Sequence, residues 1–89
     1  MAASNPLHAT EEDPCARFIR AAQQLRERIR RNTEDARDLR ASIAVLQAAA
    51  PPDAAKIQLL EKELNTVEQQ IHDGQVDLQH FEFEISLNC

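Results

Sequence analysis

The sequence predicts an all-α protein, an antiparallel two-helix coiled-coil hairpin that completes a four-helix bundle by oligomerisation. Two apolar ladders, each with alternating spacings of three and four residues, lead to this prediction. The first ladder comprises Phe18, Ala22, Leu25, Ile29, Asn32, Ala36, Leu39, Ile43 and Leu46. The second comprises Ile57, Leu60, Leu64, Val67, Ile71, Gly74, Leu78, Phe81 and Ile85. The 89 residues include one glycine and three aromatic residues. These are too few glycines for the turns, and too few aromatic residues for the core, of a compact sheet domain.

The first predicted helix covers residues 14–50. Asp13 is a suitable N-cap, and Pro14 suits the first helical position because its missing N–H has no intrahelical partner there. Pro51 disfavours helical geometry at Ala50, so the helix is expected to end there.

The second predicted helix covers residues 53–87 and repeats the same start signal, with Asp53 as the cap. The turn at 50–53 is so short that the two helices must lie side by side and antiparallel. At 1.5 Å per residue, each helix is roughly 50 Å long. We therefore expect one domain, residues 13–89, after a flexible segment at residues 1–12.

The composition restricts the class of partner and the location. Residues 1–12 contain no apolar run, so we expect no secretory signal, and no stretch approaches the roughly 20 apolar residues that span a bilayer. We therefore predict a cytoplasmic or nuclear protein without a membrane partner. The net charge of −5 argues against nucleic acid as the main partner.

Folding the chain at its paired prolines brings the two ladders together as one seam. The register places Leu46 opposite Ile57, Leu39 opposite Leu64 and Phe18 opposite Ile85. Bulky positions then face small ones, as close packing requires: Ala22 faces Phe81, Ala36 faces Val67 and Ile29 faces Gly74. The same register predicts two ion pairs beside the seam, Arg28 with Asp77 and Arg40 with Glu61.

Two seam positions depart from the apolar pattern. Asn32 either specifies an oligomeric state across a dimer axis or directs its amide to solvent, and the sequence favours neither. Gly74 in mid-helix costs about 1 kcal/mol relative to Ala. We interpret Gly74 as tolerance of a gap behind Ile29, rather than as a bend or a close approach of the helices.

A single seam buries little apolar surface, so we looked for a second apolar face. Val76, Phe83 and Leu87 lie off the seam at helical spacing, and Ile19 flanks the same end. A smaller patch near the turn contains Val45 and Leu59. We predict a partner interface at the open end, the end opposite the turn, made of Phe18, Ile19, Val76, Phe81, Phe83 and Leu87.

We find no pattern of catalytic or cofactor-binding residues. His72 and His80 are eight residues apart on one helix, with no third ligand at metal spacing, so both are interpreted as surface side chains. A two-helix rod also lacks a concave pocket for a small-molecule substrate. The predicted function is therefore a non-catalytic scaffold or adaptor that associates with itself or with other coiled-coil subunits.

The alternative function is nucleic-acid binding or regulation through Arg30, Arg31 and Arg37 on the first helix. Acidic residues interleave with this cluster, and Glu27 has the i,i+4 spacing to pair with Arg31. No aromatic residue lies beside the cluster for base stacking. We therefore interpret the cluster first as a solvated charged face.

The register brings Cys15 and Cys89 to the open end together. A disulfide there would close a long loop and stabilise the fold. Because no secretory signal is evident and the terminus is expected to fray, we predict two free thiols instead.

Overall fold

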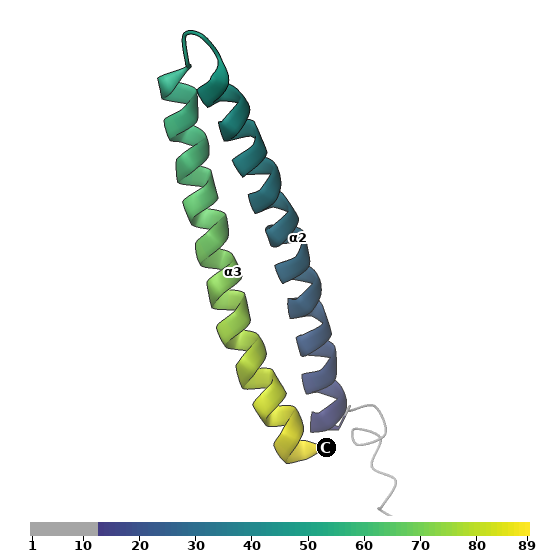
Figure 1. The fold of residues 1–89 in the computed structure, drawn as a ribbon. Coiled ribbons are helices and arrows are strands. Elements are labelled where there is room, and N and C mark those ends of the chain that lie inside the picture. The colour runs from purple at the N-terminus through teal and green to yellow at the C-terminus, as the bar shows by residue number, and fades with distance from the viewer. Residues whose placement is uncertain (1–12) are drawn as a thin grey trace, which may run out of the picture.

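The computed structural model describes residues 13–89, which form two long helices joined by a short turn (Figure 1). Helix α2 spans Pro14–Ala48 and helix α3 spans Ala54–Asn88, each with 35 residues. The helices run antiparallel and pack against each other along their length, and no strand occurs in the described part of the chain. The predicted all-α hairpin is therefore confirmed. The segment predicted to be flexible, residues 1–12, lies outside the described residues.

Both helices begin at the predicted caps. The Asp13 carboxylate accepts a hydrogen bond from the Ala16 N–H at 2.9 Å, and Asp53 accepts one from the Lys56 N–H at 3.1 Å. Each bond satisfies one of the N–H groups that have no partner within the helix.

Helix α2 ends at Ala48, two residues earlier than predicted. Ala49 is already extended, with φ −70° and ψ 154°, and its N–H donates to the Leu46 carbonyl at 3.3 Å. Pro51 and Pro52 have no N–H, so the carbonyls of Gln47 and Ala48 cannot receive the hydrogen bonds that would continue the helix.

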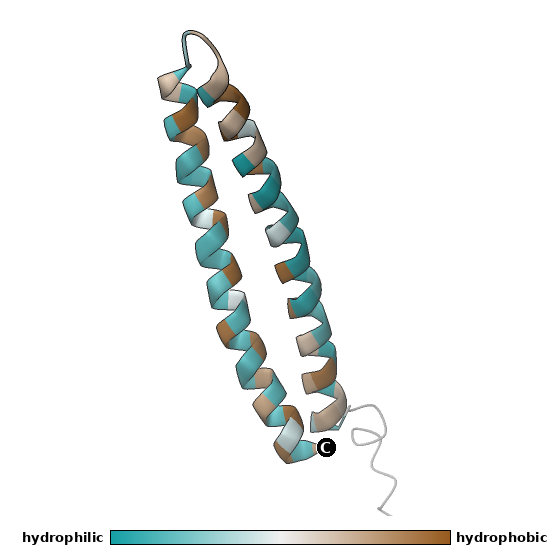
Figure 2. Cartoon of the chain, in the orientation of Figure 1, coloured by the Kyte–Doolittle hydropathy of each residue, from teal (hydrophilic) through white to brown (hydrophobic). Residues whose placement is uncertain are grey.

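The two ladders form the seam. Among the described residues the buried ones are Ala22, Leu25, Ala36, Ile43 and Gly74. All five are ladder positions, and every other ladder residue is half-buried. Hydrophobic residues recur along both helices between hydrophilic stretches (Figure 2). Most of the surface of both helices is thus left to solvent, and the core is narrow.

One predicted pairing of the register is confirmed by a direct contact, because Gly74 lies against Ile29. The ring of Phe18 lies 6.2 Å from the ring of Phe81 between centroids, although the register places Phe18 opposite Ile85 and Phe81 opposite Ala22. Both contacts lie between the middle of the hairpin and its open end.

Arginines of α2 form ion pairs with glutamates of α3, but the partners differ from those predicted. Arg40 pairs with Glu68 at 2.7 Å rather than with Glu61, and Arg26 pairs with Glu82 at 3.4 Å. Arg26 and Arg40 are two heptads apart, as are Glu68 and Glu82, so one register accounts for both pairs. Arg28 and Asp77 line the same surface hollow without an ion pair between them. For Arg40 the two acidic candidates, Glu61 and Glu68, are one heptad apart, and sequence spacing did not distinguish them.

The interpretation of Gly74 as tolerance of a gap is wrong. A Cβ built on Gly74 would lie 3.0 Å from Cγ1 and 3.5 Å from Cδ1 of Ile29. The first distance is shorter than ordinary contact between carbon atoms, which is about 3.5–4.0 Å. Gly74 therefore marks a close approach of the two helices.

We expect Gly74→Ala to leave the free energy of unfolding unchanged or to lower it, because the contact with Ile29 offsets the better helix propensity of Ala. In an Ile29→Ala background, the same substitution should raise the free energy of unfolding by about 1 kcal/mol. Denaturant titrations of the four proteins measure the difference. An equal gain in both backgrounds would contradict a close approach at Gly74.

Candidate protein-binding interface

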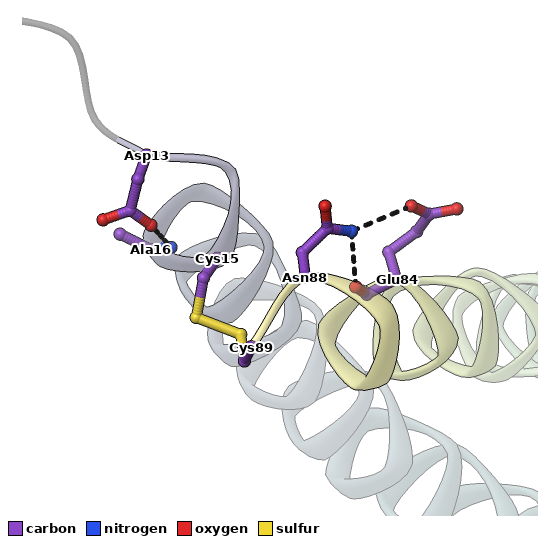
Figure 3. Close-up of a disulfide and its surroundings, with 6 residues drawn as sticks. All are labelled: Asp13, Cys15, Ala16, Glu84, Asn88 and Cys89. Carbon is purple, nitrogen blue, oxygen red and sulfur yellow. Dashed lines mark hydrogen bonds between the residues drawn. A yellow bond between two sulfur atoms is a disulfide. The ribbon is translucent and has the colours of Figure 1, made fainter.

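The open end of the hairpin is closed by a disulfide between Cys15 and Cys89 (Figure 3). The two Cα atoms are 5.4 Å apart, within the range that a disulfide bridges. The prediction of two free thiols is therefore wrong, although the predicted meeting of the two cysteines is confirmed. Free thiols were predicted because no secretory signal is evident and the terminus was expected to fray. The packing of the two helices brings the sulfur atoms together in spite of both considerations.

The last turn of α3 is hydrogen-bonded rather than frayed. The Cys89 N–H donates to the Ile85 carbonyl at 2.9 Å, and the Asn88 side-chain amide donates to the Glu84 carbonyl at 2.7 Å (Figure 3). The first bond satisfies one of the carbonyl groups that lack a partner within the helix, and the second ties the Asn88 side chain to the last turn. The helix therefore continues to Asn88 and holds Cys89 beside the first turn of α2.

Four of the predicted interface residues are exposed near this end. On α3, Phe83 is 61% exposed, Leu87 65% and Val76 40%, and they are spaced seven and four residues apart along one face. On α2, Ile19 is 39% exposed. We call these four residues the open-end stripe. A Phe and a Leu that are more than half exposed on an otherwise charged helix form an unusual surface.

The other two predicted interface residues belong to the seam. Phe18 and Phe81 are half-buried and contact each other across the helices with an angle of 43° between ring planes. Tilted aromatic pairs at this separation stabilise folds beyond the area that they bury. In the closed hairpin these rings hold α2 and α3 together, so they offer less surface to a partner than Phe83 does.

A second group of exposed apolar residues lies near the turn. Val45 is 70% exposed and Leu59 is 58% exposed, as their positions off the seam predict. They come from different helices and lack an exposed aromatic neighbour, so this patch is a weaker candidate for an interface.

The arginines predicted as an alternative nucleic-acid face are largely paired within α2. Arg30 donates to both Glu27 and Glu34, and Arg31 lies 3.8 Å from the Glu27 carboxylate, as its spacing predicts. The hydrogen bond from Arg30 holds the pKa of Glu27 below its ordinary value, and the same bond raises the pKa of Arg30. A lowered carboxyl pKa means that this pairing favours the fold at neutral pH and is lost as the pH falls through the folded-state pKa.

Arg37 is exposed and has no ion pair within residues 13–89. Its neighbours in the predicted face are held by carboxylates, which a phosphate group would have to displace. The basic cluster therefore presents little uncompensated positive charge.

Asn32 is half-buried and lines a surface hollow with Arg28, Gln70, Asp73, Gly74 and Asp77. No buried side-chain nitrogen or oxygen lacks a hydrogen bond in the described hairpin. The Asn32 amide is thus within reach of water in a single hairpin. Its role in specifying an oligomer stays a prediction.

The described residues contain no group of three or more His, Cys, Asp or Glu side chains placed to hold a metal ion. Neither helix has a stretch that is both long and apolar enough to span a lipid bilayer. Comparisons with protein-family models, curated proteins and solved structures found no match.

Proposed function

We propose that this protein is a non-catalytic coiled-coil scaffold or adaptor, which assembles through the open-end stripe. The observation that carries the proposal is the exposure of Phe83 and Leu87 beside Val76 on one face of α3. Burying such side chains in a partner stabilises a complex by roughly 1.5–3 kcal/mol each. The narrow core of the hairpin supports the same conclusion, because additional packing would stabilise so thin a rod.

A second copy of the hairpin is the preferred partner. Between Pro14 and Ala48 there are eight Arg against four acidic residues, whereas between Ala54 and Asn88 there are two Lys against seven. In a four-helix bundle, α2 of one copy therefore meets favourable charge on α3 of another. Charges of this kind set alignment and partner choice more than affinity, so a different coiled-coil subunit with a basic helix is the other partner that fits.

The mode of association is helix-in-groove packing, with Phe83 as the anchor. Aromatic side chains near the centre of an interface usually carry a large share of the binding energy. Leu78, Phe81 and Ile85 are half-buried in the seam, where they support the face that presents Phe83. Nucleic acid is a poor fit as a partner, because carboxylates of α2 already pair with Arg30 and Arg31.

We place the protein in the cytoplasm or the nucleus, and this location has a consequence for its disulfide. Thiols are kept reduced in those compartments, and disulfides persist chiefly where conditions are oxidising. A protein at work there would have its Cys15–Cys89 bond opened, whereas the closed hairpin belongs to oxidising conditions.

We expect Phe83→Glu to convert the assembly to single hairpins, because a carboxylate in place of the anchor would have to lose its water on association. Sedimentation equilibrium at several protein concentrations measures the change as a shift of mass to that of one chain. Leu59→Glu is the matched control, since Leu59 is also an exposed apolar residue on α3 but lies at the turn. The control should assemble normally.

A monomeric parent protein, with Phe83→Glu leaving mass and unfolding unchanged, would contradict self-assembly through the open-end stripe. Equal dissociation by Leu59→Glu would instead place the interface at the turn.

A further inference from the structure

The disulfide at the open end joins two sulfur atoms in unequal surroundings. Cys15 is the second residue of α2 and is half-buried, whereas Cys89 follows the last residue of α3 and is exposed. An external thiol therefore has better access to Cys89 than to Cys15.

The two cysteines also differ in their electrostatic surroundings, because they lie at opposite kinds of helix end. The N-terminus of α2 carries the positive end of its helix dipole, and the C-terminus of α3 carries a negative end. A thiolate is favoured at a helix N-terminus, so Cys15 is the better place for the negative charge. Of the charged residues drawn in Figure 3, Asp13 lies on the α2 side of the bond, and Glu84 lies on the α3 side, where its carboxylate meets the Asn88 amide. The Asp13 carboxylate works against a Cys15 thiolate, but it already accepts a hydrogen bond from the Ala16 N–H.

We propose that the open end is a thiol–disulfide exchange site, at which a low-molecular-mass thiolate attacks Sγ of Cys89 and Cys15 leaves as the thiolate. The attacking sulfur, having given up its proton to solvent, forms a new bond to Cys89 as the Cys15–Cys89 bond breaks. The electron pair of the broken bond goes to the Cys15 sulfur. Exchange is faster when the leaving thiol has the lower pKa, so access and leaving-group preference both select this direction.

A second equivalent of the same thiol completes the reduction. It attacks the external sulfur of the mixed disulfide and releases Cys89 as a thiolate, so that two thiols are oxidised to one disulfide and the protein gains two electrons. The proposal thus treats Cys89 as the residue that receives the thiol, and it holds whether or not the open-end stripe binds a partner.

Opening the bond releases the end of the hairpin. On α2 no residue before Ala22 is buried, and on α3 none after Gly74 is, within the described part of the chain. Besides the disulfide, the contacts that join the helices near this end include the Phe18–Phe81 ring pair and the exposed Arg26–Glu82 ion pair. Exposed ion pairs stabilise by only about 0–1 kcal/mol, so the terminal turns depend heavily on the covalent link.

Brief treatment of the native protein with glutathione, followed by acid quenching and blocking of the free thiol with N-ethylmaleimide, identifies the attacked sulfur. Trypsin separates the two cysteines, because cleavage after Arg17 and after Lys62 places them in different peptides. We expect glutathione on Cys89 and maleimide on Cys15 to exceed the reverse product by about tenfold.

The same reaction in denaturant is the control, since unfolding removes both the helix ends and the difference in access. There the two products should approach equal amounts. An even distribution in the native protein, a preference for Cys15, an equal preference after denaturation or failure of the bond to exchange would each overturn the proposal.

Hydrogen exchange of the fully reduced protein tests the release of the terminal turns. Amide protection should fall in residues 14–21 and 82–88 and persist in the middle of both helices. Unchanged protection at the open end would show that the bond does not hold these turns.

Discussion

Replacing both cysteines, as Cys15→Ser with Cys89→Ser, is expected to lower the free energy of unfolding by roughly 2–5 kcal/mol. The bond links residues 74 apart in sequence, so it closes nearly the whole hairpin into one loop and restricts the unfolded chain severely. Chemical denaturation followed by far-ultraviolet circular dichroism, at one fixed protein concentration, measures the loss.

The parent protein with its disulfide reduced is the control for the serine substitutions. It should unfold at the same denaturant concentration as the double variant, because both lack the covalent link. Equal denaturation midpoints for the oxidised parent and the double variant would mean that the bond contributes nothing to stability. The seam alone would then have to hold the two helix ends together.

Leu25→Ala is expected to lower the free energy of unfolding by about 2–4 kcal/mol, because it removes the largest kind of side chain that this narrow core buries. Leu25 is 7% exposed and lies in the seam between Ala22 and Ile29. Few other buried residues are present to compensate, so the fractional loss of stability should be large. The shift of the denaturation midpoint measures it.

Leu59→Ala is the matched substitution at a site that is 58% exposed. It makes the same chemical change in a helix of the same length, and surface changes of this kind usually alter stability by less than about 0.5 kcal/mol. Similar losses for the two variants would mean that Leu59 is covered in solution, which would move the partner interface toward the turn.

The apolar spacing in the sequence predicted the seam residue by residue. Ladder positions are recognised locally, since residues three and four apart share one face of a helix whatever the helix packs against. The same reasoning found Val76, Phe83 and Leu87 as an exposed face of α3. It also placed Phe18 and Phe81 in the partner interface, because periodicity does not show that the two rings pack against each other across the seam.

The errors concern distances between groups that are far apart in the chain. Arg40 could reach Glu61 or Glu68, which are one heptad apart. The position of α3 along the axis of α2 brings Glu68 to it. The spacing also could not tell a gap at Gly74 from the close approach that the Ile29 contact reveals.

The start of each helix, the single reversal at the prolines and the apolar face of each helix all follow from the order of the amino acids. Caps, proline geometry and the helical repeat are properties of neighbouring residues, so no knowledge of the fold was needed. The tertiary structure decided the covalent closure of Cys15 with Cys89, the partners of the arginines and the contact at Gly74. Each of these depends on separations of a few ångströms between two helices, which are set by how their side chains interlock and not by either helix alone.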